Sequence, residues 1–438
     1  MAALNVWMNG EAVGTWQRGR TGRHLFRYDE GWLRSPHCRP LSLSLPITGD
    51  RQLTGDAVAN YFENLLPDSD AIRRRVQARY RTASADAFEL LGAIGRDCAG
   101  AVQLLPEGAD PDGFDRVEAR RLGERDIEQH LLNVTAPPSL GANEDPDDFR
   151  ISIAGAQEKT ALLRLGTRWC RPLGATPTTH ILKLPLGLVG GRRLNMTHSV
   201  ENEWLCAQIL KAFGLPVAKT EIASFGTQKV LVVERFDRAW VDGGRWIARL
   251  PQEDMCQATA TPPERKYEAH GGPGMARLLA LLQRSDEPDA DGARFLRTQL
   301  AFWLLAAIDG HAKNFSIFNK GMESFALTPL YDVLSAWPVI GNGPGEIRWQ
   351  RAKLAMAVRS KNAHYNLHEI ETRHWQGLAR RSAVPGVWAQ MREMVEHAEL
   401  ALIGVADRLP PDFPAELFEQ VAAGVADQVR RFERGLVG

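Results

Sequence analysis

The sequence predicts an α+β fold, because strand-period segments with a few helices among them occupy about the first 250 residues and helical-period segments occupy the rest. Its 438 residues exceed what one domain usually holds, so we expect more than one. We place an N-terminal subdomain at 1–110, a strand-rich region at 111–250 and a helical C-terminal lobe at 251–438. The helices expected in this lobe are 274–282, 293–308, 369–382, 387–409 and 415–436.

The N-terminal subdomain begins with a hairpin signal, since Asn9-Gly10 separates two short apolar runs. Leu41 to Leu45 alternates with serine, which is typical of a half-buried strand. Apolar residues at helical spacing then predict a helix from 54 to 66, and the Pro67-Asp68-Ser69 sequence ends it and starts another. A helix at 88–94 and a strand at 100–105 complete this part.

The middle region reads as strands around one helix. We expect loops at 106–113 and 136–148, both rich in proline or acidic residues. Strands are predicted at 151–153, 161–165, 179–184 and 230–233, with a helix at 199–213.

Composition excludes several classes of protein. Apolar residues make up 44% of the chain, which is enough for a packed core, and 53 basic residues balance 53 acidic ones, so net charge favours no partner. The longest strongly apolar stretch, about 302–308, is far shorter than the roughly 20 residues of a membrane span, and no signal peptide is visible. The five cysteines are scattered, which argues for reduced thiols, against zinc and for a cytoplasmic protein.

The strongest local motif is Asp309-Gly-His-Ala-Lys-Asn314, directly after an apolar helical run, with Asp332 further along. A phosphotransferase needs a carboxylate beside the attacking hydroxyl, and an amide oxygen and a second carboxylate for Mg²⁺. Protein kinases place the first carboxylate and the amide five positions apart, as Asp309 and Asn314 are. Asp309-Gly310 alone would be read as a turn, but the three residues in this order favour ATP-dependent phosphoryl transfer.

Three upstream segments supply the other parts of a nucleotide site. Lys183 lies on an apolar strand and would hold ATP phosphates, with Glu203 or Glu201 of the next helix as its partner. An edge-strand lysine reaching water is the alternative. The strand that ends at Glu234-Arg235-Phe236 is a candidate hinge whose backbone would bond adenine, or else an ordinary strand end.

The loop from Ser152 to Lys159 contains small residues that let a backbone approach phosphate closely. Taken alone it favours a plain hairpin connection, because it matches neither common phosphate-binding glycine pattern.

Together these segments resemble the HipA family, the serine/threonine-kinase toxins of HipBA toxin–antitoxin systems. The likeness spans nearly the whole chain. It rests on the segments 148–159, 178–185, 233–238, 250–256, 309–316 and 330–332, and on Asn64-Leu-Leu-Pro-Asp-Ser69 and Gly95-Arg-Asp97.

The resemblance implies a two-lobed kinase-like fold with an extra N-terminal α/β subdomain and an all-helical C-terminal lobe. It implies Asp309 as catalytic base, Asn314 and Asp332 as Mg²⁺ ligands, and Ser152 as an autophosphorylation site whose phosphate expels the loop from the ATP site. The ATP-binding residues it implies are Ala154, Gly155, Ala156, Gln157, Glu158, Lys159, Lys183, Glu234, Arg235, Phe236, His311 and Tyr331.

The resemblance also implies partners. These are a HipB-like helix-turn-helix antitoxin, operator DNA reached mainly through it, and glutamyl-tRNA synthetase as the substrate whose modification stops translation and favours persistence. Arg380 and Arg381 match a DNA-contacting region only in part, and the pattern of the two residues favours a solvated helix face over a DNA contact. Two other functions stay open, a small-molecule phosphotransferase and a kinase fold that only corepresses with its antitoxin.

Overall fold

The computed structural model describes residues 2–19, 21–136, 152–155, 157–190, 194–321 and 323–437. The chain forms two compact units that alternate along the sequence. Unit 1 comprises Met1–Leu184, Ala223–Glu264 and Ser316–Phe325, and unit 2 comprises Pro185–Ile222, Arg265–Phe315 and Ala326–Gly438. The division at residues 110 and 250 follows sequence order and stays a prediction.

Unit 1 begins with an antiparallel five-stranded sheet in the order β4-β3-β2-β1-β5. The predicted hairpin is confirmed, since Asn9 and Gly10 form the turn between paired Met8 and Glu11 with positive φ angles of 45° and 85°. The elements are β1 (Ala2–Met8), β2 (Glu11–Arg18), β3 (His24–Tyr28), α1 (Glu30–Arg34), β4 (Gln52–Thr54), α2 (Asp56–Glu63), α3 (Asp70–Tyr80), α4 (Ala87–Ile94) and β5 (Val102–Pro106).

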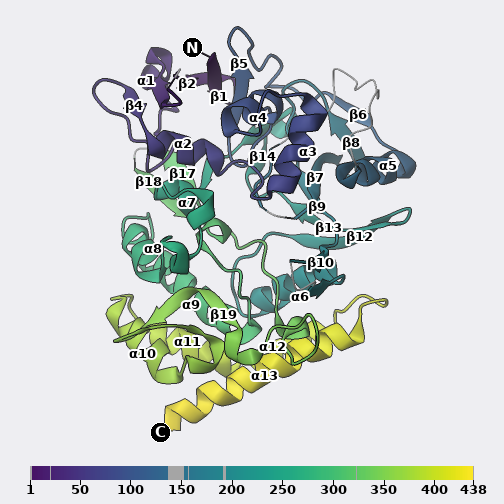
Figure 1. Ribbon diagram of the computed structural model, residues 1–438, viewed down its shortest axis with the longest axis vertical. Coiled ribbons are helices and arrows are strands. Elements are labelled where there is room, and N and C mark those ends of the chain that lie inside the picture. The colour runs from purple at the N-terminus through teal and green to yellow at the C-terminus, as the bar shows by residue number, and fades with distance from the viewer. Residues whose placement is uncertain are drawn as a thin grey trace. The chain divides into compact units, whose positions relative to one another are not determined.

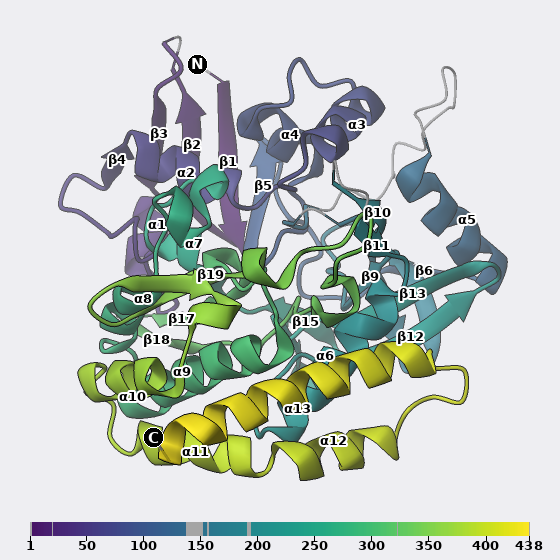
Figure 2. The same ribbon diagram turned by 60° about the horizontal axis from the view of Figure 1, so that its bottom comes forward.

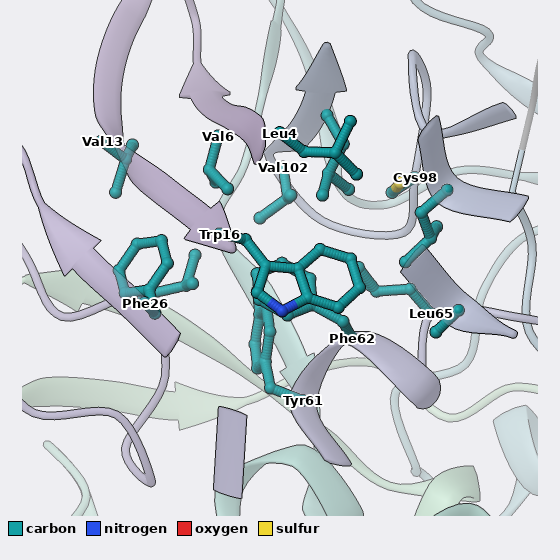
Figure 3. Close-up of a cluster of buried hydrophobic side chains, with 14 of the residues drawn as sticks. Leu4, Val6, Val13, Trp16, Phe26, Tyr61, Phe62, Leu65, Cys98 and Val102 are labelled. Atoms are coloured by element: carbon teal, nitrogen blue, oxygen red, sulfur yellow. The ribbon is translucent and has the colours of Figure 1, made fainter. Parts of the chain in front are cut away.

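Helices α2 and α4 cover one face of this sheet and close an aromatic core (Figure 1). Trp16 of β2 lies at the centre of that core, fully buried, with its ring stacked on Phe62 of α2 at a centroid distance of 3.9 Å (Figure 3). Phe88 of α4 meets the edge of the same indole at 4.9 Å. One tryptophan therefore joins the sheet to both of its helices.

The second sheet of unit 1 has six strands in the order β12-β13-β9-β7-β8-β6, with α5 packed on β7 and β13. Short strand pairs follow it in the chain, β14 with β15 and the set β16-β17-β18. The elements are β6 (Ala119–Arg121), α5 (Glu124–Thr135), β7 (Lys159–Leu165), β8 (Arg168–Pro172), β9 (His180–Lys183), β12 (Thr220–Phe225), β13 (Gln228–Glu234), β14 (Arg238–Val241), β15 (Trp246–Arg249), β16 (Gln252–Asp254), α7 (Met255–Ala258), β17 (Ser316–Gly321) and β18 (Ser324–Leu327).

Unit 2 is mainly helical. The long helix α13 packs against α9, α10 and α12, and Figure 2 shows it in yellow along the neighbouring helices. The elements are β10 (Gly187–Val189), β11 (Leu194–Met196), α6 (Ser199–Ala212), α8 (Met275–Leu282), α9 (Pro288–Leu305), β19 (Lys353–Arg359), β20 (Ala363–Asn366), α10 (Thr372–Arg381), α11 (Val387–Glu396), α12 (Ala398–Ala406) and α13 (Ala415–Val437).

The α+β class and most helices are confirmed, and three details differ. The expected strand at Leu41–Leu45 is an irregular turn with one bridge, because Ser42 and Ser44 bond Glu253 and the carbonyl of Gln257 instead of a neighbouring strand. The helix expected at 387–409 is broken at His397 into α11 and α12. The C-terminal lobe is not all-helical, since the hairpin of β19 and β20 lies within it.

Two of the expected segments reach beyond the described residues. Residue 151 and nearly all of the 136–148 loop lie outside them, and Ser152 and Ile153 form no strand. Across the described ranges, no helix is both long and apolar enough to cross a membrane.

Replacing Trp16 tests the aromatic core. Trp16→Ala removes a fully buried indole and leaves a cavity, so it should lower the free energy of unfolding by about 3–5 kcal/mol in urea titrations. Trp240 is the matched control, because its side chain on β14 is 50% exposed and Trp240→Ala should change stability by less than about 0.5 kcal/mol. Equal losses for the two variants would contradict the assignment of Trp16 to the core.

Candidate active site

The end of α9 delivers Asp309 to the surface of unit 2. The helix stops where Ala306 takes a left-handed conformation with φ of 48°. Gly310 then passes so close to Phe302 that a Cβ there would meet its ring at 2.4 Å, which explains the glycine. The Asp309 side chain is 62% exposed, and the backbone N–H of buried His311 donates to its carbonyl oxygen at 2.7 Å.

Asn314 and Asp332 meet within the same unit. Asn314 Nδ2 donates to the Asp332 carbonyl oxygen at 3.3 Å and approaches its Oδ2 at 3.5 Å. Tyr331 Oη donates to the Lys313 carbonyl oxygen at 2.9 Å. This bond ties the residue before Asp332 to the residue before Asn314. Asp332 has a positive φ of 61°, a conformation that is strained for a non-glycine residue and is often found at functional sites.

Neutral hydrogen bonds hold the Asp332 segment against the end of α9. Asn202 of α6 donates to the Ser335 carbonyl oxygen and accepts from its N–H, both at 2.8 Å. Ser335 Oγ donates to the Leu305 carbonyl oxygen at 2.6 Å. The same hydrogen bonds therefore connect the end of α9, which leads to Asp309, with the segment that follows Asp332, although 22 residues of chain lie between the two aspartates.

The donor set fits Mg²⁺. The Oδ1 atom of Asn314 is buried and has no hydrogen-bond partner among the described residues, and Asp332 adds carboxylate oxygens beside it. Oxygen ligands of this kind, completed by phosphates and water, are what Mg²⁺ uses in kinases. No cluster of three or more His, Cys, Asp and Glu side chains suited to a metal occurs in the described parts of the chain.

The Ser152 loop belongs to unit 1 and is packed against the N-terminal subdomain. Ser152 is fully buried, with its Oγ donating to the Leu65 carbonyl oxygen at 2.7 Å and its N–H donating to the Asp97 carbonyl oxygen at 3.1 Å. Gly155, with φ of 112°, forms a parallel bridge with Pro67. The loop therefore rests on two separate segments of the subdomain.

Other residues of the loop hold it to its own sheet. Lys159 Nζ donates to the Ala154 carbonyl oxygen at 2.6 Å, and Gln157 Nε2 donates to the Leu184 carbonyl oxygen at 2.6 Å. Glu158 forms an ion pair with Arg75 of α3. Ala156, also predicted to bind ATP, lies outside the described residues.

The lysine and hinge candidates are in the six-stranded sheet. Lys183 is 5% exposed at the end of β9, opposite Leu231 of β13. Arg235 follows β13, and its N–H donates to the Thr179 carbonyl oxygen at 2.9 Å. Its backbone donor is thus already used, so adenine contacts at this strand end would fall to Glu234 and Phe236.

The side chain of Arg235 is part of a buried ion cluster, which the sequence reading did not assign. Asp97 accepts from Arg235, Arg238 and Arg249 at 3.2, 2.9 and 3.0 Å, and all these side chains are at most 4% exposed. Burial alone would raise the pKa of Asp97, but the three guanidiniums hold it well below its usual range. Burial and the neighbouring Arg235 lower the pKa of Arg238 to about 10.

The remaining predicted residues are placed separately. Glu201 and Glu203 are buried on α6 of unit 2, whereas Lys183 is in unit 1, so their pairing stays a prediction. Arg380 and Arg381 are exposed at the end of α10, and Arg381 donates to the carbonyl oxygen of Arg359.

The structure adds Tyr267, whose hydroxyl donates to Asp309 Oδ1. No single-sequence signal marks such a partner, because Tyr267 precedes Asp309 by 42 residues.

Comparisons with known proteins agree along the chain. The family model described as the HipA N-terminal domain matches residues 4–105, and the HipA-like C-terminal domain matches residues 151–403. The Sinorhizobium fredii protein Y4mE, named provisionally as a kinase, is 33% identical over 92% of this chain and 92% of its own. The serine/threonine-protein kinase toxin HipA of Shewanella oneidensis is 30% identical over 70% of this chain and 69% of its own.

The fold is similar to that of a solved structure. The chain superposes on a complex of HipA, HipB and operator DNA from Shewanella oneidensis with a TM-score of 0.79, covering 98% of this chain and 97% of the other at 24% identity. The kinase-like two-lobed fold expected from the sequence is thereby confirmed.

Removing the charge of Asp97 tests the ion cluster. Asp97→Asn leaves three guanidiniums without their shared carboxylate, so it should lower the free energy of unfolding at pH 7 by about 3–5 kcal/mol. Since the folded pKa is depressed, wild type loses this stability as pH falls below the unfolded value of about 4, and the difference from the variant should narrow there.

Denaturant titrations at pH 7 and at acidic pH measure both effects. Asp115→Asn is the control, because its pair with Arg245 is 44% and 64% exposed and should contribute less than about 1 kcal/mol. A pH-independent difference between wild type and Asp97→Asn would contradict the depressed pKa.

Proposed function

The chain belongs to the HipA family, and from that premise we propose that it is a serine/threonine-protein kinase that transfers the γ-phosphate of ATP to a protein hydroxyl. The observation that carries the proposal is the contact of Asn314, five positions after Asp309 in the sequence, with Asp332, with one buried amide oxygen left without a hydrogen bond among the described residues. An amide oxygen beside a carboxylate is what phosphoryl transfer uses to hold its metal ion.

Each of the three residues has one role in this proposal. Asp309, exposed at the surface, orients the substrate hydroxyl and accepts its proton. Asn314 Oδ1 and the Asp332 carboxylate would hold Mg²⁺. When bound, the ion would neutralise the charge that develops on the phosphates. The amide supplies an oxygen without adding negative charge, which suits a site that also receives a polyanion.

ATP binding is assigned to unit 1. Lys183 would neutralise phosphate charge at the end of β9, and the backbone of Glu234 and Phe236 would bond adenine. The loop that includes Ala154, Gly155, Gln157, Glu158 and Lys159 would cover the phosphates. His311 and Tyr331 of unit 2 are the remaining candidates, and Ala156 stays a candidate by sequence alone.

Ser152 is proposed as the autophosphorylation site that switches the enzyme off. Its hydroxyl now donates to the Leu65 carbonyl oxygen in a fully buried position. A phosphate there has mainly acceptor oxygens and nearly two negative charges, so it would face that carbonyl without a matching donor. The phosphorylated loop would have to leave this position, and the ATP-binding loop would leave with it.

We assign the substrate and the partners from membership of the HipA family. We assign glutamyl-tRNA synthetase as the protein substrate, which would make the chain a translation-inhibiting toxin. A HipB-like helix-turn-helix antitoxin and operator DNA are assigned as partners, supported by the complex of HipA, HipB and operator DNA that this fold matches. Arg380 and Arg381 at the exposed end of α10 are the DNA candidates, and chromatography of the chain with antitoxin and operator would test this assembly.

Kinase activity is tested by labelling with ATP. Wild type with Mg²⁺ and labelled ATP should label glutamyl-tRNA synthetase, whereas Asp309→Gln and Asp332→Asn should each lower the rate by about 100-fold or more, since one loses the base and the other a metal ligand. Asp412→Asn, at an exposed position of the same unit, should leave the rate unchanged.

Two other results would each redirect the assignment. Labelling that survives Asp309→Gln would remove Asp309 as the base. Turnover of small hydroxyl compounds without any protein labelling would favour a small-molecule phosphotransferase, and no turnover at all would favour a non-catalytic corepressor.

Self-inactivation is tested at Ser152. Wild type incubated with Mg-ATP should lose ATP binding as a phosphate accumulates on Ser152, whereas Ser152→Ala should stay active, because no phosphate forms in the buried position. Phosphopeptide mass spectrometry and ATP titrations measure the two quantities. Ser44→Ala, in the same unit, should inactivate like wild type, and full ATP binding by Ser152-phosphorylated protein would contradict the switch.

A further inference from the structure

A tyrosine in the loop before α8 reaches the proposed base. Tyr267 Oη donates a hydrogen bond to Asp309 Oδ1. The tyrosine ring meets the edge of His311 at a centroid distance of 4.9 Å and an angle of 85°, and the Lys266 ammonium lies 5.6 Å from the ring centroid. The Ala312 N–H donates to the Lys266 carbonyl oxygen at 3.4 Å, so backbone as well as side chains join the two segments.

Glu268 anchors this loop to β19. Its side chain is 7% exposed, and its Oε2 accepts from the Ala357 N–H at 2.7 Å. Its Oε1 accepts from Arg359 Nε and Nη2 at 3.0 and 2.5 Å. The carbonyl oxygen of Tyr267 accepts from the Gly272 N–H at 3.0 Å, which closes the loop on itself. The contacts with Asp309 and His311, together with the anchor of Glu268 on β19, thus hold Tyr267 in place.

We propose that Tyr267 is a positioning residue for Asp309, because its hydrogen bond fixes the orientation of the carboxylate that would face the substrate hydroxyl. The inference rests on the proposed function, because Tyr267 has this role only if Asp309 is the base. It extends that function by assigning a residue outside the Asp309–Asn314 and Asp332 motifs.

Orientation of the carboxylate is what this hydrogen bond supplies. The Asp309 side chain is 62% exposed on a turn, and His311 Nε2 lies 3.9 Å from the same Oδ1 atom that accepts from Tyr267. A hydrogen bond to an ionised group is among the stronger ones in proteins, and orientation of the reacting groups contributes directly to rate. The phenol therefore limits rotation of the proposed base.

The substitution Tyr267→Phe removes the hydroxyl and keeps the ring. We expect kcat to fall about tenfold or more, which corresponds to one hydrogen bond to a charged group, with the KM for ATP and the melting temperature unchanged. A merely structural tyrosine would not separate kcat from KM in this way. Asp412→Asn, at an exposed position of the same unit, should leave kcat unchanged.

The outcomes of the Tyr267→Phe experiment distinguish a failure of the positioning role from a failure of the proposed kinase function. An active wild type whose kcat is unaffected by Tyr267→Phe would overturn the positioning role alone. A rise in kcat would also overturn it, because the phenol would then be blocking the base. A wild type without turnover would overturn the proposed function and this inference together.

A second variant covers the case in which Tyr267→Phe does not fold. Glu268→Gln keeps the phenol but weakens its anchor to Arg359, and should lower kcat with the KM for ATP unchanged. Full kcat in Glu268→Gln would then overturn the positioning role.

Discussion

The buried carboxylate of Asp97 is the constraint on which unit 1 depends. Its side chain holds the guanidiniums of Arg235, Arg238 and Arg249, while its carbonyl oxygen accepts from the Ser152 N–H. One residue of the N-terminal subdomain thus fixes the strand end proposed as hinge and the loop proposed to cover the phosphates. Burying several charges costs free energy that an apolar cluster would not, so we infer that the cluster serves to define positions more than to add stability.

Unit 2 reaches the same precision with neutral groups. Asn202 and Ser335 exchange two backbone-to-amide hydrogen bonds, and the Ser335 hydroxyl reaches the last turn of α9. Ion pairs thus hold the strand end proposed as hinge in unit 1, whereas hydrogen bonds between neutral groups hold the segment that follows Asp332 in unit 2.

Sequence reasoning succeeded where the signal is local. The helices follow from apolar spacing and the first hairpin from Asn9-Gly10, whereas the roles of Asp309 and Asn314, read from a short motif, stay a prediction. Sequence reasoning failed where contacts with residues far away in the sequence determine the local structure. Leu41–Leu45 alternates like a strand, but Glu253 and Gln257 capture its polar groups. The contact of Asp97 with Arg235 spans 138 residues, and no spacing rule on a single chain predicts such pairs.

The Ser152 loop and Tyr267 belong to different units, and we expect them to influence phosphoryl transfer at different steps. The Ser152 loop belongs to the unit to which we assign ATP, so its proposed displacement would act on nucleotide binding. Tyr267 belongs to the unit that contains the proposed base, so its hydrogen bond would act on the chemical step. A change in ground-state binding appears in KM, whereas an interaction needed only in the transition state appears in kcat. Phosphorylation of the loop and loss of the phenol should thus leave different kinetic signatures, even though each lowers the rate of phosphoryl transfer.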